Sequence, residues 1–169
     1  MINTNRFVRL LRHFVCTTGR AASTYGVDGL SRIERAISDG EKLHSCEIRF
    51  VVESNLDSTE IWHRIHPRDR AMHLFGQLNI WDTAQNNGLL LYVLLADHAI
   101  EIVVDRAIRE VLPDSHWQQV LVQITASYKA NDFTNSTISA LDQISKDLAI
   151  HFAPVANDKN ELPNKATLI

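Results

Sequence analysis

Four oxygen-bearing side chains lie at the ends of the two most apolar segments of the chain. Asp82, Asn86 and Asn87 stand in the loop D-T-A-Q-N-N-G, which runs directly into an unbroken apolar run, and Asp105 ends the next strand-like segment. Calcium and magnesium prefer oxygen ligands, which carboxylates, amide carbonyls and backbone carbonyls supply. Glu101, which shares a strand face with Asp105, is a further candidate ligand. The pattern therefore predicts a weak Ca²⁺ or Mg²⁺ site built from these five residues.

The same loop also permits an interpretation without a metal ion. Asp and Asn side chains commonly hydrogen-bond to nearby backbone groups, and Asn87-Gly88 is a frequent turn pair. The loop is not an EF-hand, because D-x-[DN]-x-[DN]-G and its terminal glutamate are missing. With two or three carboxylates, the dissociation constant of a divalent cation is expected to be on the order of 0.1 to 1 mM.

The usual motifs of phosphatases and zinc enzymes do not occur in the sequence. Cys16 and Arg20 lack the spacing of a phosphocysteine loop, and the chain has neither a D-x-D nucleophile nor a glycine-rich phosphate loop. A metal-bound water could still hydrolyse a phosphoester. The histidines form no H-E-x-x-H motif, which disfavours zinc, and His13, His44 and His98 are expected at the surface. No catalytic residue is assigned.

Three segments that position the candidate ligands are predicted to form a mixed sheet. Residues 46–53 alternate as a strand does, whereas residues 89–95 are apolar on both faces, as in a central strand covered by helices. A helix that begins at Pro67 connects them, and such a crossover favours a parallel pair. The next connection is so short that residues 100–105 must return antiparallel. The loop and Asp105 should therefore meet at one end of the sheet.

Helices are predicted around this sheet. Apolar side chains recur at helical spacing in residues 28–43, 114–128 and 134–152. Residues 1–20 combine apolar residues and arginines in an amphipathic pattern. This indicates either a helix packed on the domain with solvated arginines or a helix that binds a membrane surface or a partner. The predicted fold is α/β, a single-domain three-layer sandwich with a central mixed β-sheet flanked by helices on both faces.

Composition restricts the class of protein. The 169 residues are 45% hydrophobic and 22% charged, as in one ordinary globular domain. A net charge of -3 and a pI near 6.2 give no reason to expect nucleic-acid binding. The apolar runs are far shorter than the ~20 residues of a membrane span, and the N-terminus does not have the pattern of a signal peptide. With only two cysteines, we expect a cytoplasmic protein.

Distinctive short motifs and single aromatic residues are distributed along the chain. They are Glu47–Phe50, Ile80–Thr83, Asn86–Gly88, Ile100–Arg106, Trp117, Phe133 and Asn160–Pro163. Together they resemble a known family, the TPM domain, whose name comes from a plant thylakoid-lumen phosphatase-like protein, a photosystem II repair protein and a modulator of nematode acetylcholine receptors. The resemblance is to the short, soluble bacterial branch, and it extends from about residue 30 to the end of the chain. The chain then divides into an N-terminal amphipathic helix (1–20), a TPM-like α/β domain (21–153) and a polar C-terminal tail (154–169).

The resemblance implies three functions, which remain open at this stage. Family members are linked to divalent-cation binding, to acid-phosphatase activity and to the repair or regulation of membrane proteins. The first hypothesis is a non-enzymatic, cation-binding regulatory or interaction module that acts on membrane-protein partners. Peripheral contact with a membrane remains open. The second is a weak metal-dependent acid phosphatase, and the third is a metal-independent protein-interaction domain. The sequence does not indicate the partner or the oligomeric state.

Overall fold

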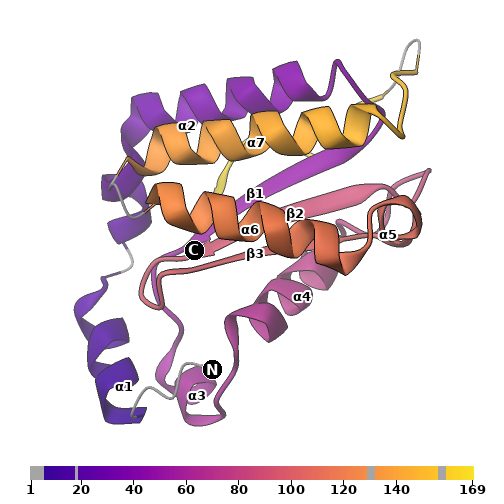
Figure 1. The fold of residues 1–169 in the computed structure, drawn as a ribbon. Coiled ribbons are helices and arrows are strands. Elements are labelled where there is room, and N and C mark those ends of the chain that lie inside the picture. The colour runs from indigo at the N-terminus through magenta and orange to yellow at the C-terminus, as the bar shows by residue number, and fades with distance from the viewer. Residues whose placement is uncertain (1–5, 18, 129–131, 156–158) are drawn as a thin grey trace.

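The computed structural model describes residues 6–17, 19–128, 132–155 and 159–169. Residues 1–5 and 18 of the predicted N-terminal segment lie outside this range. Figure 1 shows how the helices and strands are arranged. In chain order they are α1 (Arg6–Val15), α2 (Arg20–Gly40), β1 (Glu47–Glu53), α3 (Ser58–Trp62), α4 (Pro67–Gln77), β2 (Gly88–Leu94), β3 (Ala99–Val104), α5 (Arg106–Val111), α6 (Asp114–Tyr128), α7 (Phe133–Ala149) and β4 (Thr167–Leu168).

The four strands form one mixed sheet in the order β3-β2-β1-β4. β1 and β2 are parallel, joined through α3 and α4, and β2 and β3 are antiparallel and joined by a tight hairpin. His98 closes that hairpin with a left-handed φ of 51°. The predicted α/β class, the parallel crossover and the antiparallel return are therefore confirmed.

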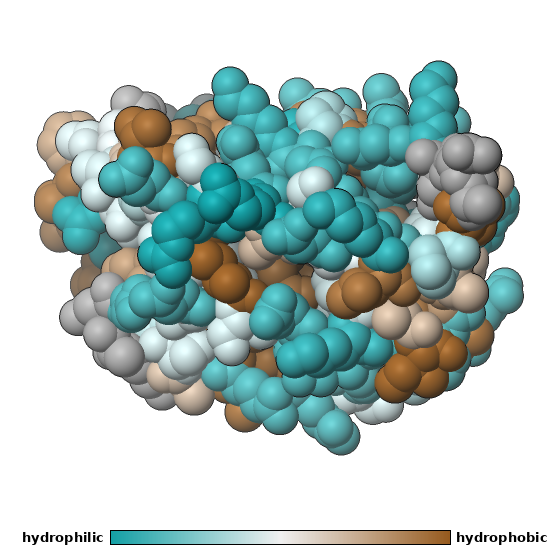
Figure 2. Space-filling view, turned by 90° about the horizontal axis from the view of Figure 1, so that it is seen from above, coloured by the Kyte–Doolittle hydropathy of each residue, from teal (hydrophilic) through white to brown (hydrophobic). Residues whose placement is uncertain are grey.

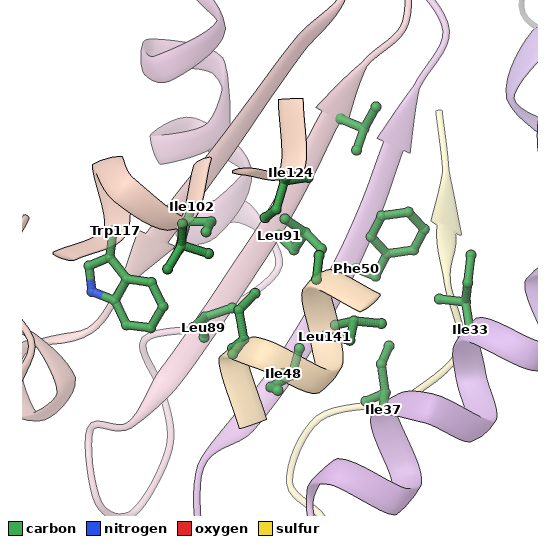
Figure 3. Close-up of a cluster of buried hydrophobic side chains, with 14 of the residues drawn as sticks. Ile33, Ile37, Ile48, Phe50, Leu89, Leu91, Ile102, Trp117, Ile124 and Leu141 are labelled. Atoms are coloured by element: carbon green, nitrogen blue, oxygen red, sulfur yellow. The ribbon is translucent and has the colours of Figure 1, made fainter. Parts of the chain in front are cut away.

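Helices cover both faces of the sheet and form a three-layer sandwich (Figure 1). All seven residues of β2 are buried, which explains why its sequence is apolar on both faces. One face packs on α2, α6 and α7, where Phe50, Leu91 and Leu141 belong to the same core (Figure 3). The opposite face packs on α4 through Leu74 and Tyr92. Burying each such side chain contributes about 1.5–3 kcal/mol to stability.

The outer surface of the α2 and α7 layer is mostly hydrophilic, as Figure 2 shows from that side. α2 begins at Arg20, earlier than the predicted helix at 28–43, and it kinks at Gly26, where φ is 66°.

Among the described residues, no helix combines the length and the apolar composition that crossing a membrane requires.

Residues 159–169 of the C-terminal tail pack along β1. Leu162 is buried, and its N–H donates a hydrogen bond of 3.0 Å to the Glu47 carboxylate. β4 then pairs in parallel with β1, next to Val51 and Val52. The tail thus supplies the fourth strand of the sheet.

Candidate functional site

The loop between α4 and β2 is organised by Thr83. The Thr83 hydroxyl accepts the N–H of Asn87 at 3.0 Å, and the Thr83 carbonyl accepts the N–H of Asn86 at 3.1 Å. Asn86 adopts a left-handed φ of 53°, a conformation that asparagine tolerates better than most residues. These turns bring the chain from the exposed Asp82 into the buried start of β2.

The loop and the end of β3 meet, as the hairpin topology predicts. The N–H of Asp105 donates to the Gly88 carbonyl at 2.9 Å, and the N–H of Ala107 donates to the Asn86 carbonyl at 3.1 Å. The Asn86 side-chain oxygen accepts a hydrogen bond of 2.7 Å from the Arg106 guanidinium. Asn86 thus connects the loop to the start of α5, and its side-chain oxygen already binds the Arg106 guanidinium.

Glycine is required at position 88 because a side chain has no room there, and not because the backbone adopts a left-handed conformation. Its φ is not positive, but a Cβ built on it would lie 2.0 Å from the carbonyl oxygen of Ile80. The turn that the sequence assigns to Asn87-Gly88 therefore lies one residue earlier in the chain. Asn86 takes the left-handed conformation, and Gly88 allows the loop to cross β2 at close range.

Asn87 and Asp105 each present a buried oxygen that receives no hydrogen bond from the described residues. The Asn87 side chain is 1% exposed; its Nδ2 donates to the Ser45 carbonyl, whereas its Oδ1 has no donor. Asp105 caps α5 with Oδ1, which accepts the N–H of Arg106 at 2.6 Å, while its buried Oδ2 has no donor. Buried acceptors of this kind are uncommon, and a water molecule or a cation can supply the missing partner.

A carboxylate from the tail also reaches the loop. Both carboxylate oxygens of Glu161 accept the N–H of Ala84, at 3.1 and 3.2 Å. Glu161 was not among the sequence-predicted ligands, although the N-E-L-P segment that contains it was among the motifs that resemble the family. It is therefore an additional candidate ligand beside Asp82.

Glu101 lies apart from these residues. It pairs with Tyr92 in the middle of the β2–β3 hairpin and is oriented toward α4, where its carboxylate lies 3.8 Å from the Arg68 guanidinium. Burial raises the pKa of Glu101, and the charge of Arg68 partly opposes this. β3 ends at Val104 and Asp105 is the N-cap of α5, and the structure does not bring Glu101 to the loop.

Further carboxylates gather at this end of the sheet, where β1 and β2 both begin. Glu47 is 6% exposed, and Glu41 accepts the N–H of Ile48 at 3.1 Å. Burial, reinforced by the charge of Glu47, raises the pKa of Glu41 to about 7. Burial therefore favours the neutral, protonated form of Glu41 at this end of the sheet.

The donor types at the loop suit hard cations better than zinc. Carboxylate and amide oxygens bind Ca²⁺ and Mg²⁺, whereas zinc sites are usually built from Cys and His. Within the described part of the chain, no group of three or more His, Cys, Asp or Glu residues is arranged to hold a metal ion. His13 and His44, expected at the surface, are instead buried.

The chain is similar to a known protein family and to solved structures. The family model described as the TPM domain matches residues 28–147. The solved structure of the BA42 protein from the psychrophilic bacterium Bizionia argentinensis is similar over 83% of this chain and 92% of that chain, with 30% sequence identity and a TM-score of 0.70. The N-terminal domain of a protein from P. gingivalis, 12% identical, covers 73% of this chain and 93% of that chain with a TM-score of 0.48. No curated protein matches the chain.

Proposed function

This chain belongs to the TPM domain family, and we propose that it is a non-enzymatic module that binds Ca²⁺ or Mg²⁺ at the loop between α4 and β2. The observation that carries the proposal is the pair of buried oxygens without a hydrogen-bond donor, Asn87 Oδ1 and Asp105 Oδ2. Both belong to residues next to the hydrogen bond that joins Gly88 to Asp105. Asp82 and Glu161 supply carboxylates on the exposed side of the same loop.

The cation acts by ordering the loop and the start of α5, and so shapes a surface for a protein partner. The side-chain oxygens of Asn86 and Glu101 already interact with Arg106 and Arg68. The ligands of the proposed cation are therefore Asp82, Asn87, Asp105 and Glu161. Cys16 and Cys46 are buried and form no disulfide, which supports the cytoplasmic location that the proposal assumes.

A titration with Ca²⁺ and with Mg²⁺, followed by amide chemical shifts and by the melting temperature, tests the proposal. We expect shifts confined to residues 82–88, 105–108 and 161, and a rise in Tm of about 3–6 °C at ten times the dissociation constant. Asp105→Asn is the sharpest variant, because asparagine also caps helices well and the substitution removes only the charge. Asp82→Asn and Glu161→Gln remove the other two carboxylates.

Asp39→Asn is the matched control, since Asp39 is an exposed carboxylate near the end of α2 that pairs with Lys42 in the following turn. It should leave both the shifts and the affinity unchanged. Shifts that are absent, or equally reduced by Asp39→Asn and Asp105→Asn, exclude a cation site at this loop.

The enzymatic alternative uses the same oxygens together with the exposed guanidinium of Arg106, which lies at the loop and could contact a phosphate. A generic phosphomonoester assayed with and without Mg²⁺ separates the two functions. Turnover that is lost in both Asp105→Asn and Arg106→Ala would establish the phosphatase and replace the non-enzymatic proposal.

A further inference from the structure

α1 is docked on the domain by its polar side. The Arg9 guanidinium donates to Asp97 Oδ2 from Nε at 3.0 Å and from Nη2 at 2.7 Å, and Nη2 also donates to the Ile65 carbonyl at 2.8 Å. His13, one turn further along, accepts the N–H of Leu56 at Nδ1, and its Nε2 lies 3.1 Å from Asp97 Oδ1. The three side chains are almost completely covered, with exposed fractions of 16% for Arg9, 1% for His13 and 7% for Asp97.

This docking turns the apolar side of α1 outward. Leu11, Phe14 and Val15 are 64%, 85% and 71% exposed. An amphipathic helix on a globular domain normally buries its apolar side. The orientation here is the reverse, and it differs from the mostly hydrophilic outer surface of α2 and α7 (Figure 2). The prediction that α1 packs on the domain with its arginines in solvent is therefore wrong for Arg9, whose side chain is covered.

A groove of about 430 Å³ continues this apolar surface onto the β2–β3 hairpin. Its apolar wall is formed by Val8, Leu11 and Val15 from α1 together with Leu95 and Ala96 from the hairpin. The charged residues that line it are Arg12 and Arg20. Because Asp97 is neutralised by Arg9 and covered, the groove presents apolar side chains with a positive border.

We propose that α1 and this groove bind the surface of a membrane that contains anionic lipids. An exposed apolar helix face with arginines at its border is the arrangement by which interfacial helices enter the boundary between lipid headgroups and acyl chains. Anionic headgroups attract Arg12 and Arg20, while Leu11, Phe14 and Val15 are buried among the acyl chains. The ion pair of Arg9 with Asp97 holds the helix in the orientation that this contact requires.

A second copy of the chain fits this surface less well. A ten-residue helix is about 15 Å long and about 10 Å wide, so one face covers about 150 Å², against about 800 Å² per partner in a stable protein interface. A symmetric contact would also bring the arginines of the two copies together. A lipid surface has no such minimum area, and its charge complements that of the groove.

The membrane contact is independent of the cation site. α1 meets the hairpin at the carboxyl end of β2, whereas the loop and Asp105 lie at the opposite end of that strand. Binding in the presence of a chelator therefore tests this inference alone, and its failure would leave the proposed cation site untouched.

Flotation with phosphatidylcholine vesicles, with and without phosphatidylserine, tests the proposal on the full chain in the presence of EDTA. We expect wild-type protein to float with the vesicles that contain phosphatidylserine, and the bound fraction to fall as salt is added. Val15→Glu should lower the partition at least tenfold. Val122→Glu is a matched control, because Val122 on α6 is also a helical valine that is 71% exposed.

The double variant Arg12→Gln, Arg20→Gln should remove the preference for phosphatidylserine. Circular dichroism should show the same melting temperature for Val15→Glu and Val122→Glu, because both sites are exposed. The proposal is overturned if wild type binds neither vesicle, if it binds both equally, or if the two glutamate variants float alike. A concentration-dependent dimer that Val15→Glu abolishes would assign the surface to a second copy instead.

Discussion

Arg70 on α4 forms a two-point ion pair with Glu53 at the end of β1, in the core between the sheet and the helix. Nε and Nη2 of Arg70 lie 2.9 and 2.7 Å from the two carboxylate oxygens, and the Glu53 side chain is 2% exposed. The Tyr92 hydroxyl donates to the same carboxylate at 2.5 Å, and Glu60 lies 3.0 Å from Arg70. A buried pair of this kind is costly to break, because the charge that remains has lost its partner.

Arg70→Ala should therefore lower the free energy of unfolding by about 3–5 kcal/mol. Arg68→Ala, on the same helix, should cost about 1 kcal/mol or less, because its ion pair with Glu101 is longer and Arg68 is 40% exposed. Urea denaturation followed by far-UV circular dichroism measures both. Equal losses would show that the network around Glu53 contributes nothing beyond a surface pair.

Gly88→Ala should destabilise the protein by about 1–3 kcal/mol, because the added methyl group meets the Ile80 carbonyl and the backbone must shift. Gly76→Ala provides the opposite control. Gly76 lies inside α4, and a Cβ there meets no atom within 4 Å, so alanine should stabilise by about 0.5–1 kcal/mol. Thermal melts of the two variants should move in opposite directions, and a neutral Gly88→Ala would contradict the close crossing of the loop.

Glu41 should make the protein less stable as the pH rises. Burial and then the charge of Glu47 raise its folded pKa to about 7 from 4.5, so the native state binds the proton more tightly than the unfolded chain does. This contribution is fully present below about pH 4.5 and is lost as the pH rises through about 7, with a magnitude of roughly 3 kcal/mol. Glu41→Gln should flatten the stability profile and raise stability at about pH 8.

Glu110→Gln, on the exposed side of α5, makes the same change of charge and should leave the profile steep. Urea midpoints measured at a series of pH values compare the three proteins. A profile that Glu41→Gln does not alter would show that this carboxyl group titrates normally.

Asp97 should fix α1 to the domain at neutral pH and release it in acid. Burial alone would raise its pKa, but His13 and Arg9 outweigh this and lower it to about 2. A folded pKa below the ordinary value of 3.8 contributes stability above about pH 4, which is lost as the pH falls through about 2; the shift corresponds to about 2 kcal/mol. Asp97→Asn should therefore speed amide exchange in residues 6–15 at least tenfold at neutral pH.

Asp114→Asn is the control for this experiment, because the pair of Asp114 with Arg109 is long and exposed. It should leave exchange in α1 unchanged. If Asp97→Asn also leaves the exchange rates of α1 unchanged, another contact must hold the helix.

Local patterns predicted the strands and the meeting of the loop with Asp105, while contacts between distant residues could not be predicted. A short hairpin after the apolar run of β2 places the end of β3 beside the start of β2. The position of Asp105 next to the loop could therefore be predicted. Glu161 lies 77 residues from Ala84, and a single glutamate in a polar tail carries no periodic signal. The orientation of α1 was missed for a similar reason. Spacing shows which residues share a helix face, but the face that is buried depends on Asp97, which is 88 residues from Arg9.

The outer side of β1 and two carbonyls of the edge strand β3 are engaged by the protein itself, which bears on how a polypeptide partner could bind. β4 pairs with the outer side of β1, and along β3 the carbonyls of Ile102 and Val104 accept hydrogen bonds from Arg68 and Arg109. Strand addition by a partner, like edge-to-edge aggregation, needs a row of free backbone groups. An incoming peptide would have to displace β4 to pair with β1, or these arginines to pair with the two carbonyls of β3. Helix faces and loops are therefore the surfaces through which this domain is best suited to recognise another protein.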